Sequence, residues 1–171
     1  MAATVSPGRA AAALDFDALY RGSRDDVFAY VATLLRDRAA AEDVTAQAFE
    51  RAFRKARSYD PRKGGARAWL FGIARHAALD ELRRRRRSAA LATDPPGEPA
   101  ADAAERALER AAVRAALATL PARDREVIAL KFHAGLANAE LAAVLGVSPS
   151  NAGTMLHRAM TKLREAVDDR A

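Results

Sequence analysis

One stretch near the carboxyl end, residues 139–163, constrains the fold more than any other part of the chain. Gly146 follows a run of helix-forming residues, and glycine readily adopts the left-handed conformation that ends a helix. Ser148 and Pro149 come directly after it, and these residue types are favoured at the N-cap and at the first helical position. The spacing therefore predicts a short helix, a tight turn and a longer helix. We expect Asn138 to cap the shorter helix.

The longer of these two helices divides into an apolar and a polar side. Its apolar stripe should face the domain core and consists of Ala152, Leu156, Ala159, Met160, Leu163 and Val167. Its polar side carries Ser150, Asn151, Thr154 and Arg158. In a helix-turn-helix the second helix enters the DNA major groove, with its N-terminal residues near the base edges. DNA binding is the favoured interpretation, and a helical hairpin with a solvated polar face is the alternative.

The composition favours closely packed helices over a sheet. Half of the 171 residues are hydrophobic but only 6% are aromatic, so small side chains must fill the core. The chain has no cysteine, which excludes disulfides and thiolate metal sites and agrees with a reducing, cytoplasmic location. No apolar run approaches the roughly 18 residues that a membrane span needs. We expect an all-α fold, with residues 1–13 as a disordered leader.

The net charge of +6 is distributed unevenly along the chain. Residues 1–87 contain 18 Lys and Arg against 11 Asp and Glu, a net of +7. Residues 88–171 contain 10 against 11, a net of −1. The basic character therefore lies outside the helix-turn-helix, and the first half is also expected to contact nucleic acid.

Apolar spacing predicts three helices in the first half, over about 15–35, 39–57 and 66–82. The second should bury a stripe formed by Val44, Ala48, Phe49, Ala52 and Phe53. Another face of that helix presents Asp43, Gln47 and Glu50 at helical spacing. From the residues alone, this face is interpreted as a solvated surface that complements the helix dipole.

A loop at 58–65, with the sequence SYDPRKGG, separates the second and third helices. Basic and aromatic residues alternate around it, namely Tyr59, Arg62, Lys63, Arg67 and Trp69. Rings that stack on bases and cations that follow phosphates suit unpaired nucleic acid. A lone tryptophan more often anchors a small core, however, and for Trp69 we favour the core.

The third helix runs directly into five consecutive arginines, Arg83, Arg84, Arg85, Arg86 and Arg87. Their mutual repulsion calls for phosphates or other anions nearby. Contact with phosphates is the favoured interpretation, because the run continues from a patterned helix. A solvated tail or a localisation tag is the alternative.

The composition changes sharply at residues 88–105, which contain three prolines, one glycine, four acidic residues and no basic one. Such a segment cannot bury enough apolar surface to fold, so it is predicted to be a flexible acidic linker. It joins two small helical domains, at 14–87 and 106–171. The second domain should contain about four helices, one of which has the apolar set Val127, Ile128, Leu130 and Phe132.

No arrangement of residues indicates covalent chemistry. His76, His133 and His157 lie in separate predicted elements without metal-ligand spacing. No glycine-rich phosphate loop follows a strand, and we expect no enzymatic activity, metal or cofactor. Two alternatives remain open. The chain could be a stand-alone helix-turn-helix regulator, or a nuclease-like enzyme that uses the acidic pairs at 25–26 and 42–43.

Three segments, at 41–53, 60–87 and 120–148, together resemble a known family. They read AEDVTAQAFERAF, DPRKGGARAWLFGIARHAALDELRRRRR and LPARDREVIALKFHAGLANAELAAVLGVS. In this order they resemble the two conserved regions of extracytoplasmic-function (ECF) sigma factors, and the resemblance covers nearly all of 15–167. It implies a promoter-specificity subunit of bacterial RNA polymerase that recognises the −35 and −10 promoter elements and promotes DNA melting.

The resemblance also implies roles for individual residues. The helix at 41–53 would dock Asp43, Gln47 and Glu50 on the clamp helices of the largest polymerase subunit. The loop at 59–67 would capture a flipped base of the non-template −10 strand. The implied −10 strand residues are Tyr59, Arg62, Lys63, Arg67, Trp69, Arg75, His76, Arg83, Arg84, Arg85, Arg86 and Arg87. The implied −35 residues are Ser148, Ser150, Asn151, Thr154 and Arg158. An anti-sigma factor is a further implied partner.

The chain departs from the family pattern at three places. It has Ala46-Gln47 where Gln-Glu is frequent, and Arg75-His76 where Arg-Asn is frequent. It also has Gly153 and Met155 where the recognition helix often carries Lys and Arg. These differences leave Asn151 and Thr154 as the leading candidates for reading bases.

Overall fold

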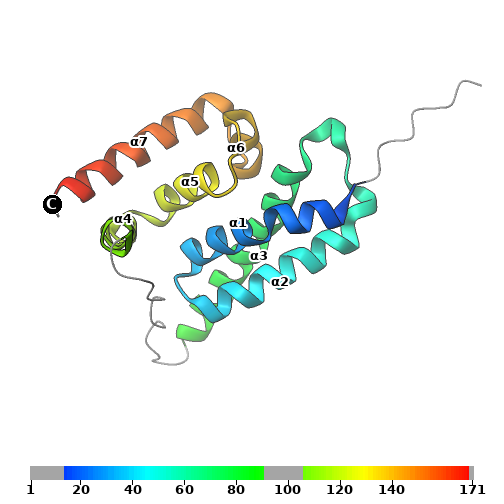
Figure 1. The fold of residues 1–171 in the computed structure, drawn as a ribbon, viewed down its shortest axis with the longest axis horizontal. Coiled ribbons are helices and arrows are strands. Elements are labelled where there is room, and N and C mark those ends of the chain that lie inside the picture. The colour runs from blue at the N-terminus through cyan, green and yellow to red at the C-terminus, as the bar shows by residue number, and fades with distance from the viewer. Residues whose placement is uncertain (1–13, 91–105, 170–171) are drawn as a thin grey trace, which may run out of the picture.

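The computed structural model describes residues 14–90 and 106–169. Within these ranges the chain forms seven α-helices and two short 3₁₀ turns, and no strand (Figure 1). The all-α prediction is therefore confirmed. The predicted leader and most of the predicted linker lie outside the described residues.

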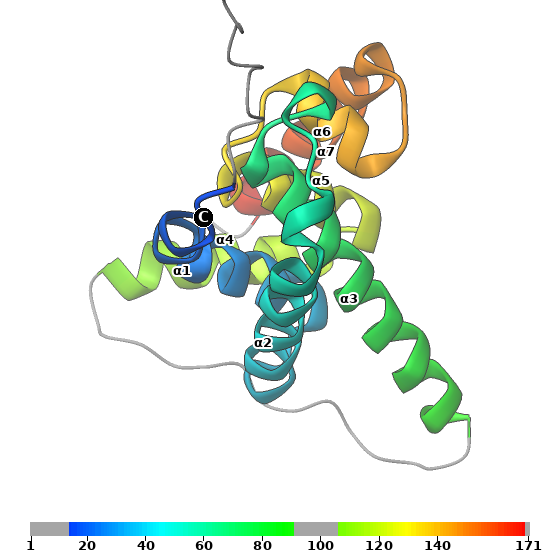
Figure 2. The ribbon, with the colours of Figure 1, turned by 90° about the vertical axis from the view of Figure 1, so that its right-hand side faces the viewer.

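The first three helices pack against one another as one unit (Figure 2). They are α1 (Phe16–Leu35), α2 (Arg38–Lys55) and α3 (Ala66–Ala89). Asp37 caps α2, because its carboxylate accepts the backbone N–H of Ala40 at 3.1 Å. Short 3₁₀ turns at Ala56–Ser58 and Pro61–Lys63 form the connection to α3. Helix α3 includes the whole arginine run, which fixes the direction in which each arginine points.

The remaining four helices form the second unit: α4 (Arg106–Thr119), α5 (Ala122–Phe132), α6 (Asn138–Leu145) and α7 (Pro149–Asp168). The turn between α6 and α7 is as predicted. Gly146 has a φ of 68°, in the left-handed region, and ends α6. Ser148 Oγ accepts the backbone N–H of Asn151 at 3.2 Å and caps α7, with Pro149 at the first helical position.

The prediction that Asn138 caps α6 is wrong, because the helix already includes Asn138 and its N-cap is Ala137. Glu140 takes over the capping role, since its carboxylate accepts the backbone N–H of Ala137 at 3.0 Å. A carboxylate in the first turn also interacts favourably with the positive end of the helix dipole. Asn138 and Glu140 both lie in the first turn of α6, and it is the Glu140 carboxylate that accepts the backbone N–H at the helix start.

Two aromatic residues are exposed: Phe53, which the sequence places in a buried stripe, and Phe132, which it places in an apolar set. Phe53 is 66% exposed and Phe132 is 64% exposed. Each lies in the last turn of its helix. The ring of Phe53 keeps one partner, because it meets the ring of Phe16 edge-on at a centroid distance of 5.3 Å.

The two helical units pack against each other through α5 and α6 on one side and α1 and α3 on the other (Figures 1 and 2). Val27, Tyr30 and Phe71 of the first unit share one continuous buried core with Val127 and Leu130 of the second. A smaller cluster under α7 contains Leu120, Ile128 and Ala159. None of the described helices combines the length and apolar composition that a membrane crossing requires.

Candidate nucleic-acid interface

The polar face of α2 is exposed as predicted. Asp43, Gln47 and Glu50 all lie on the solvent side of the helix, while Val44 and Ala48 between them are buried. Glu50 forms an ion pair with Arg54 one turn later. Asp43 and Gln47 line a polar cavity of about 320 Å³ between α2 and α3. This face therefore offers two carboxylates and an amide to an external partner.

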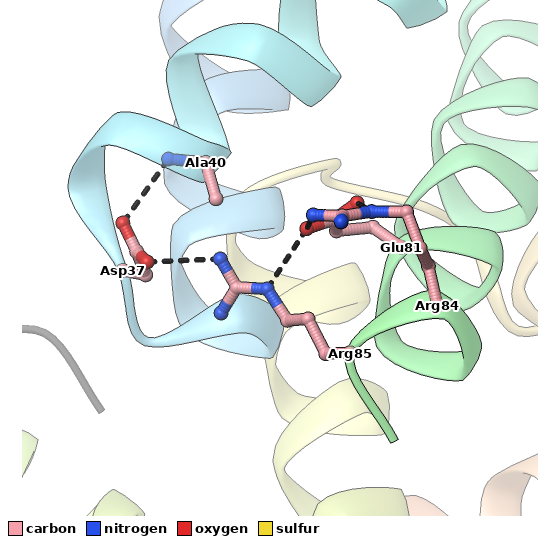
Figure 3. Close-up of polar contacts among 5 residues, drawn as sticks. All are labelled: Asp37, Ala40, Glu81, Arg84 and Arg85. Carbon is pink, nitrogen blue, oxygen red and sulfur yellow. Dashed lines mark hydrogen bonds and ion pairs between the residues drawn. The ribbon is translucent and has the colours of Figure 1, made fainter. Parts of the chain in front are cut away.

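The other wall of this cavity is a charged network on α3 (Figure 3). Arg85 bridges two acidic groups, with its Nη2 at 2.9 Å from Asp37 Oδ2 and its Nε at 2.9 Å from Glu81 Oε1. Arg84 contacts the same Glu81 carboxylate at 2.7 Å. Hydrogen bonds from Arg84 and Arg85 lower the pKa of Glu81 from 4.5 to about 2. The backbone N–H of Ala40, together with Arg85, lowers the pKa of Asp37.

The five arginines at the end of α3 are therefore not equivalent. Arg83 is paired with Asp80, Arg84 with Glu81, and Arg85 with Glu81 and Asp37. Arg86 and Arg87 are exposed, and neither forms an ion pair with the residues that the structure describes. Asp80 and Glu81 lie three or four residues before their partners, so the i,i+3 and i,i+4 pairing was readable from the sequence.

The loop between α2 and α3 is held in shape by its own side chains. Asp60 accepts two hydrogen bonds from the Arg62 guanidinium, at 3.1 and 3.0 Å, and one from the Arg62 backbone N–H. These bonds lower the pKa of Asp60. The Tyr59 hydroxyl donates to the carbonyl of Gly64 at 3.0 Å. Lys63 is exposed at the tip of the loop.

The two aromatic residues that flank this loop contact each other. The rings of Tyr59 and Trp69 lie 5.4 Å apart between centroids, at an interplanar angle of 54°. Trp69 also packs against the hydrophobic core, yet it remains partly exposed. Trp69 therefore packs against the core as expected, and the exposed part of its ring lies next to Tyr59 beside the loop. His76, further along α3, is exposed, and its Nδ1 lies 2.7 Å from the carbonyl oxygen of Gly72.

Two of the predicted −10 strand residues, Arg67 and Arg75, are partly buried and contact the second helical unit. Arg67 Nε donates to the carbonyl of Ala134 at 2.6 Å, while its Nη2 contacts Asp26 at 2.6 Å. Arg75 Nε lies 2.6 Å from Glu126 Oε1. Glu126 is only 6% exposed. Sequence analysis missed Glu126, because nothing local marks it as the partner of an arginine 51 residues earlier.

The predicted −35 residues lie together on the outer side of α7. Ser150, Asn151, Thr154 and Arg158 are all exposed. Thr154 Oγ1 donates to the carbonyl of Ser150 at 3.1 Å, which orients its hydroxyl along the helix. Met155, at a position where the family often has Lys or Arg, is partly buried against the core. Its side chain therefore does not take the DNA-facing position of a basic residue. Asn151 therefore offers the exposed amide best suited to pair with a base edge.

The three histidines do not form a shared site. His76 and His157 are exposed, whereas burial lowers the pKa of His133 despite the opposing charge of Asp26. Within the described ranges, no three side chains of the His, Cys, Asp or Glu type are placed to hold one metal ion.

Comparison with known proteins matches both halves of the chain to one family. The model of Sigma-70 region 2 matches residues 19–88, and the model of Sigma-70, region 4 matches residues 110–163. The ECF RNA polymerase sigma factor SigL of Mycobacterium tuberculosis is 35% identical over 166 residues, which cover 95% of this chain and 94% of SigL. The SigK protein of Mycobacterium sp. (strain KMS) is 32% identical over 128 residues, and the match spans 66% of its length.

Two solved structures share the fold. The sigma factor RpoE, crystallised with the anti-sigma factor NepR from Bartonella quintana, matches with a TM-score of 0.80 at 24% identity and covers 90% of this chain and 97% of its own. CnrH in complex with the cytosolic domain of CnrY matches with a TM-score of 0.68 at 26% identity, covering 91% and 89%. With regions 2 and 4 in this order and a near full-length match to SigL, the chain belongs to the ECF sigma factors, the family of subunits that direct bacterial RNA polymerase to promoters.

Proposed function

We propose that the chain binds bacterial core RNA polymerase, recognises −10 and −35 promoter elements and promotes DNA melting. The observation that carries this proposal is the presence of both region models in one chain, in family order, with a match to SigL over 95% of its length. Residues 14–87 would form the domain for polymerase and −10 binding, and residues 106–171 the domain for −35 binding. Residues 88–105 would be the linker between them.

The face of α2 formed by Asp43, Gln47 and Glu50 is the proposed contact with the clamp helices of the largest polymerase subunit. Its exposure supports this role, because no other described element covers these three side chains. Two carboxylates and one amide favour a partner surface rich in Arg and Lys. The polymerase would supply the catalysis, and the sigma chain would act in the cytoplasm as a non-enzymatic specificity subunit.

The −10 element would be bound as a single strand by the loop at 59–67 and by α3. Tyr59 and Trp69 would provide a ring surface for an unstacked base, with Arg62, Lys63 and His76 beside it. The phosphates would be held by Arg67, Arg75 and the five arginines at 83–87. Holding a flipped base offsets the unpairing cost of a few kcal/mol, so capture of the base favours melting.

The −35 element would be read as duplex by α7. Ser148, Ser150, Asn151, Thr154 and Arg158 lie on or near its exposed N-terminal half, which is the part of a recognition helix that reaches base edges. We also propose that an anti-sigma factor binds the chain, because the sigma factor RpoE, which has the same fold, was crystallised with the anti-sigma factor NepR.

Reconstitution with core polymerase tests the central claim. The purified chain should co-elute with bacterial core polymerase in size exclusion at moderate salt, and Asp43→Arg should abolish co-elution by placing a cation against the clamp. Glu165→Arg provides the matched control, because it reverses an exposed charge on α7, far from the proposed contact. Failure of the folded wild-type chain to co-elute, or equal loss in both variants, would contradict the proposal.

A further inference from the structure

Arg85 differs from its neighbours in the arginine run because it lies on the packed side of α3. It follows Ala78 and Leu82 at helical spacing, and both of these side chains pack into the hydrophobic core. The Arg85 side chain is 32% exposed, against 62% for Arg83 and Arg84. Figure 3 shows the Arg85 guanidinium reaching from α3 to the start of α2. Its direction is therefore set by helix packing.

The acceptor on α2 is the residue at which that helix begins. Asp37 accepts the backbone N–H of Ala40 with Oδ1 at 3.1 Å and the Arg85 guanidinium with Oδ2 at 2.9 Å. Only Arg36 separates Asp37 from the last residue of α1, and it has a left-handed φ of 55°, which is unfavourable for a residue with a Cβ. Backbone in such a conformation keeps its shape only where surrounding contacts fix it. Arg85 supplies one of these contacts from a different helix.

The packing of α2 on α3 is interrupted beside this contact. The polar cavity of about 320 Å³ is lined by Asp43 and Gln47 of α2 and by Glu81, Arg84 and Arg85 of α3. Side chains on opposite walls of a cavity lose their van der Waals contacts with each other. The bridge through Arg85 therefore joins the two helices where close packing does not. Asp43 and Gln47 belong to the proposed polymerase face, so the bridge lies directly beside that face.

The charges around Arg85 cancel. The backbone N–H at the start of α2, together with Arg85, lowers the pKa of Asp37, and Arg84 and Arg85 lower the pKa of Glu81 to about 2. Both carboxylates are therefore ionised at neutral pH and balance the two guanidiniums. The arginines at 86–87 are exposed and form no ion pair within the described part of the chain. A nucleic-acid strand would meet uncompensated positive charge at 86–87 and not at Arg85.

We propose that Arg85 is a positioning residue for the polymerase face and acts by holding the start of α2 on α3, whereas Arg86 and Arg87 contact phosphates. The inference rests on the proposed function of the α2 face, and it narrows the set of phosphate contacts proposed for the run. A guanidinium suits this role because its planar fork presents separate N–H groups to two carboxylates, which a compact ammonium group does not. The arginine run thus divides between the two binding activities of one domain.

Polymerase binding tests the positioning role in the full chain. In titrations of the fluorescently labelled chain with bacterial core polymerase, Arg85→Ala should raise the apparent Kd roughly 3- to 10-fold, because a smaller fraction of the chain keeps the binding orientation of α2. Arg87→Ala makes the same change two residues later on the same helix and should leave this Kd unaltered. An unchanged Kd for Arg85→Ala, or an equal rise in both variants, would overturn the inference.

Asp37→Asn tests the bridge from its other end. Asparagine is as good an N-cap as aspartate, so the variant keeps the start of α2 but removes the charge that pairs with Arg85. It should also raise the Kd for core polymerase, and adding Arg85→Ala should raise it little further, because both changes break one contact. Fully additive effects would overturn the bridge. Circular dichroism checks that each variant retains its helix content.

Hydrogen exchange in the free chain tests the bridge without polymerase. The backbone N–H groups of Ala40 and Ala41 bond to Asp37, at 3.1 and 3.0 Å. Arg85→Ala should lower their protection severalfold, because the start of α2 opens more often, and should leave buried Ala74 in the middle of α3 unchanged. Weaker polymerase binding with unchanged exchange at Ala40 would overturn positioning, since Arg85 would then contact the polymerase itself.

The salt dependence of single-strand binding tests the division of the run. For a fluorescein-labelled oligonucleotide of twenty thymidines, each lost phosphate contact should flatten the plot of log K against log salt by about 0.7. Arg87→Ala should flatten the slope by that amount, and Arg85→Ala should leave it unchanged. Equal flattening by both variants would overturn the division.

The remaining outcomes separate this inference from the proposed function. Slopes unaffected by either variant would overturn the phosphate contact of Arg87, while polymerase binding and hydrogen exchange still decide the role of Arg85. Failure of the unmutated chain to bind core polymerase would contradict the proposed function and, with it, the positioning of a polymerase face. Hydrogen exchange would then still show whether Arg85 fixes the start of α2.

Discussion

Glu81 fixes the positions of two side chains in the arginine run, those of Arg84 and Arg85. Its carboxylate accepts hydrogen bonds from both Arg84 and Arg85, and Arg85 extends the connection to Asp37 at the start of α2. A run of five like charges would otherwise repel itself along one helix. The network therefore holds Arg84 and Arg85 in place, while Asp80 pairs with Arg83, and Arg86 and Arg87 are exposed at the end of the run.

The pH dependence of stability should report this network. The pKa of Glu81 is lowered from 4.5 to about 2 in the folded chain, so its stabilising contribution is present above pH 4.5 and is lost as the pH falls toward 2. Glu81→Gln should lower the free energy of unfolding by about 1 kcal/mol at pH 7, with solvent screening limiting the effect. Urea titrations at pH 7 and pH 3 should show the difference shrinking at the lower pH. Glu42→Gln, in an exposed pair with Arg38, is the control and should cost only about 0.3 kcal/mol.

In helix α7, local residues set where the helix starts, and packing against neighbouring helices sets which side is buried. Ser148 and Pro149 set its start, and Gly146 ends the helix before it. Ala152 and Ala159 are fully buried, so small side chains bring α7 close to its neighbours. The opposite side of α7 remains exposed with Asn151 near its N-terminal end.

Removing the N-cap side chain of α7 should measurably lower the free energy of unfolding. Ser148→Ala leaves the Asn151 backbone N–H without its 3.2 Å acceptor and should lower stability by about 1 kcal/mol. Thermal and urea unfolding measure the change. Ser150→Ala, two residues later and exposed, should leave stability nearly unaltered. Equal destabilisation by both variants would show that the effect comes from something other than the cap.

The whole molecule combines two units with different proposed ligands. The proposed polymerase face lies on α2 and the proposed −35 face on α7, and the contact between Arg75 of α3 and Glu126 of α5 joins the two units. Substitutions on one face should therefore change one binding activity without the other, provided that they do not disturb the shared core.

Asn151→Ala tests this separation. It should change which −35 sequences are selected from a randomised promoter library transcribed with core polymerase, because one bidentate base contact is worth about 1–3 kcal/mol of discrimination. Co-elution with core polymerase should stay unchanged. Glu165→Gln should alter neither property. Simultaneous loss of polymerase binding and promoter selection by Asn151→Ala would contradict independent faces.

Much of the local structure could be predicted from residue spacing and capping. Helical periodicity located α1, α2 and α3, and the sequence around Gly146 and Ser148 located the turn of the helix-turn-helix. The exposed faces of α2 and α7 followed from the same periodicity. Their roles as binding sites remain predictions, because exposure alone does not identify what binds.

Local chemistry along the chain is sufficient to predict the helices, the turn residues and the family, because these depend on residues only a few positions apart or on motifs in fixed order. The exposure of Phe53 and Phe132 and the contact of Arg75 with Glu126 depend instead on how the helices pack. Arg67 likewise finds its acceptor at Ala134, 67 residues away. Such pairs form when whole helices pack, and residue spacing within one helix does not determine which other helix it will contact.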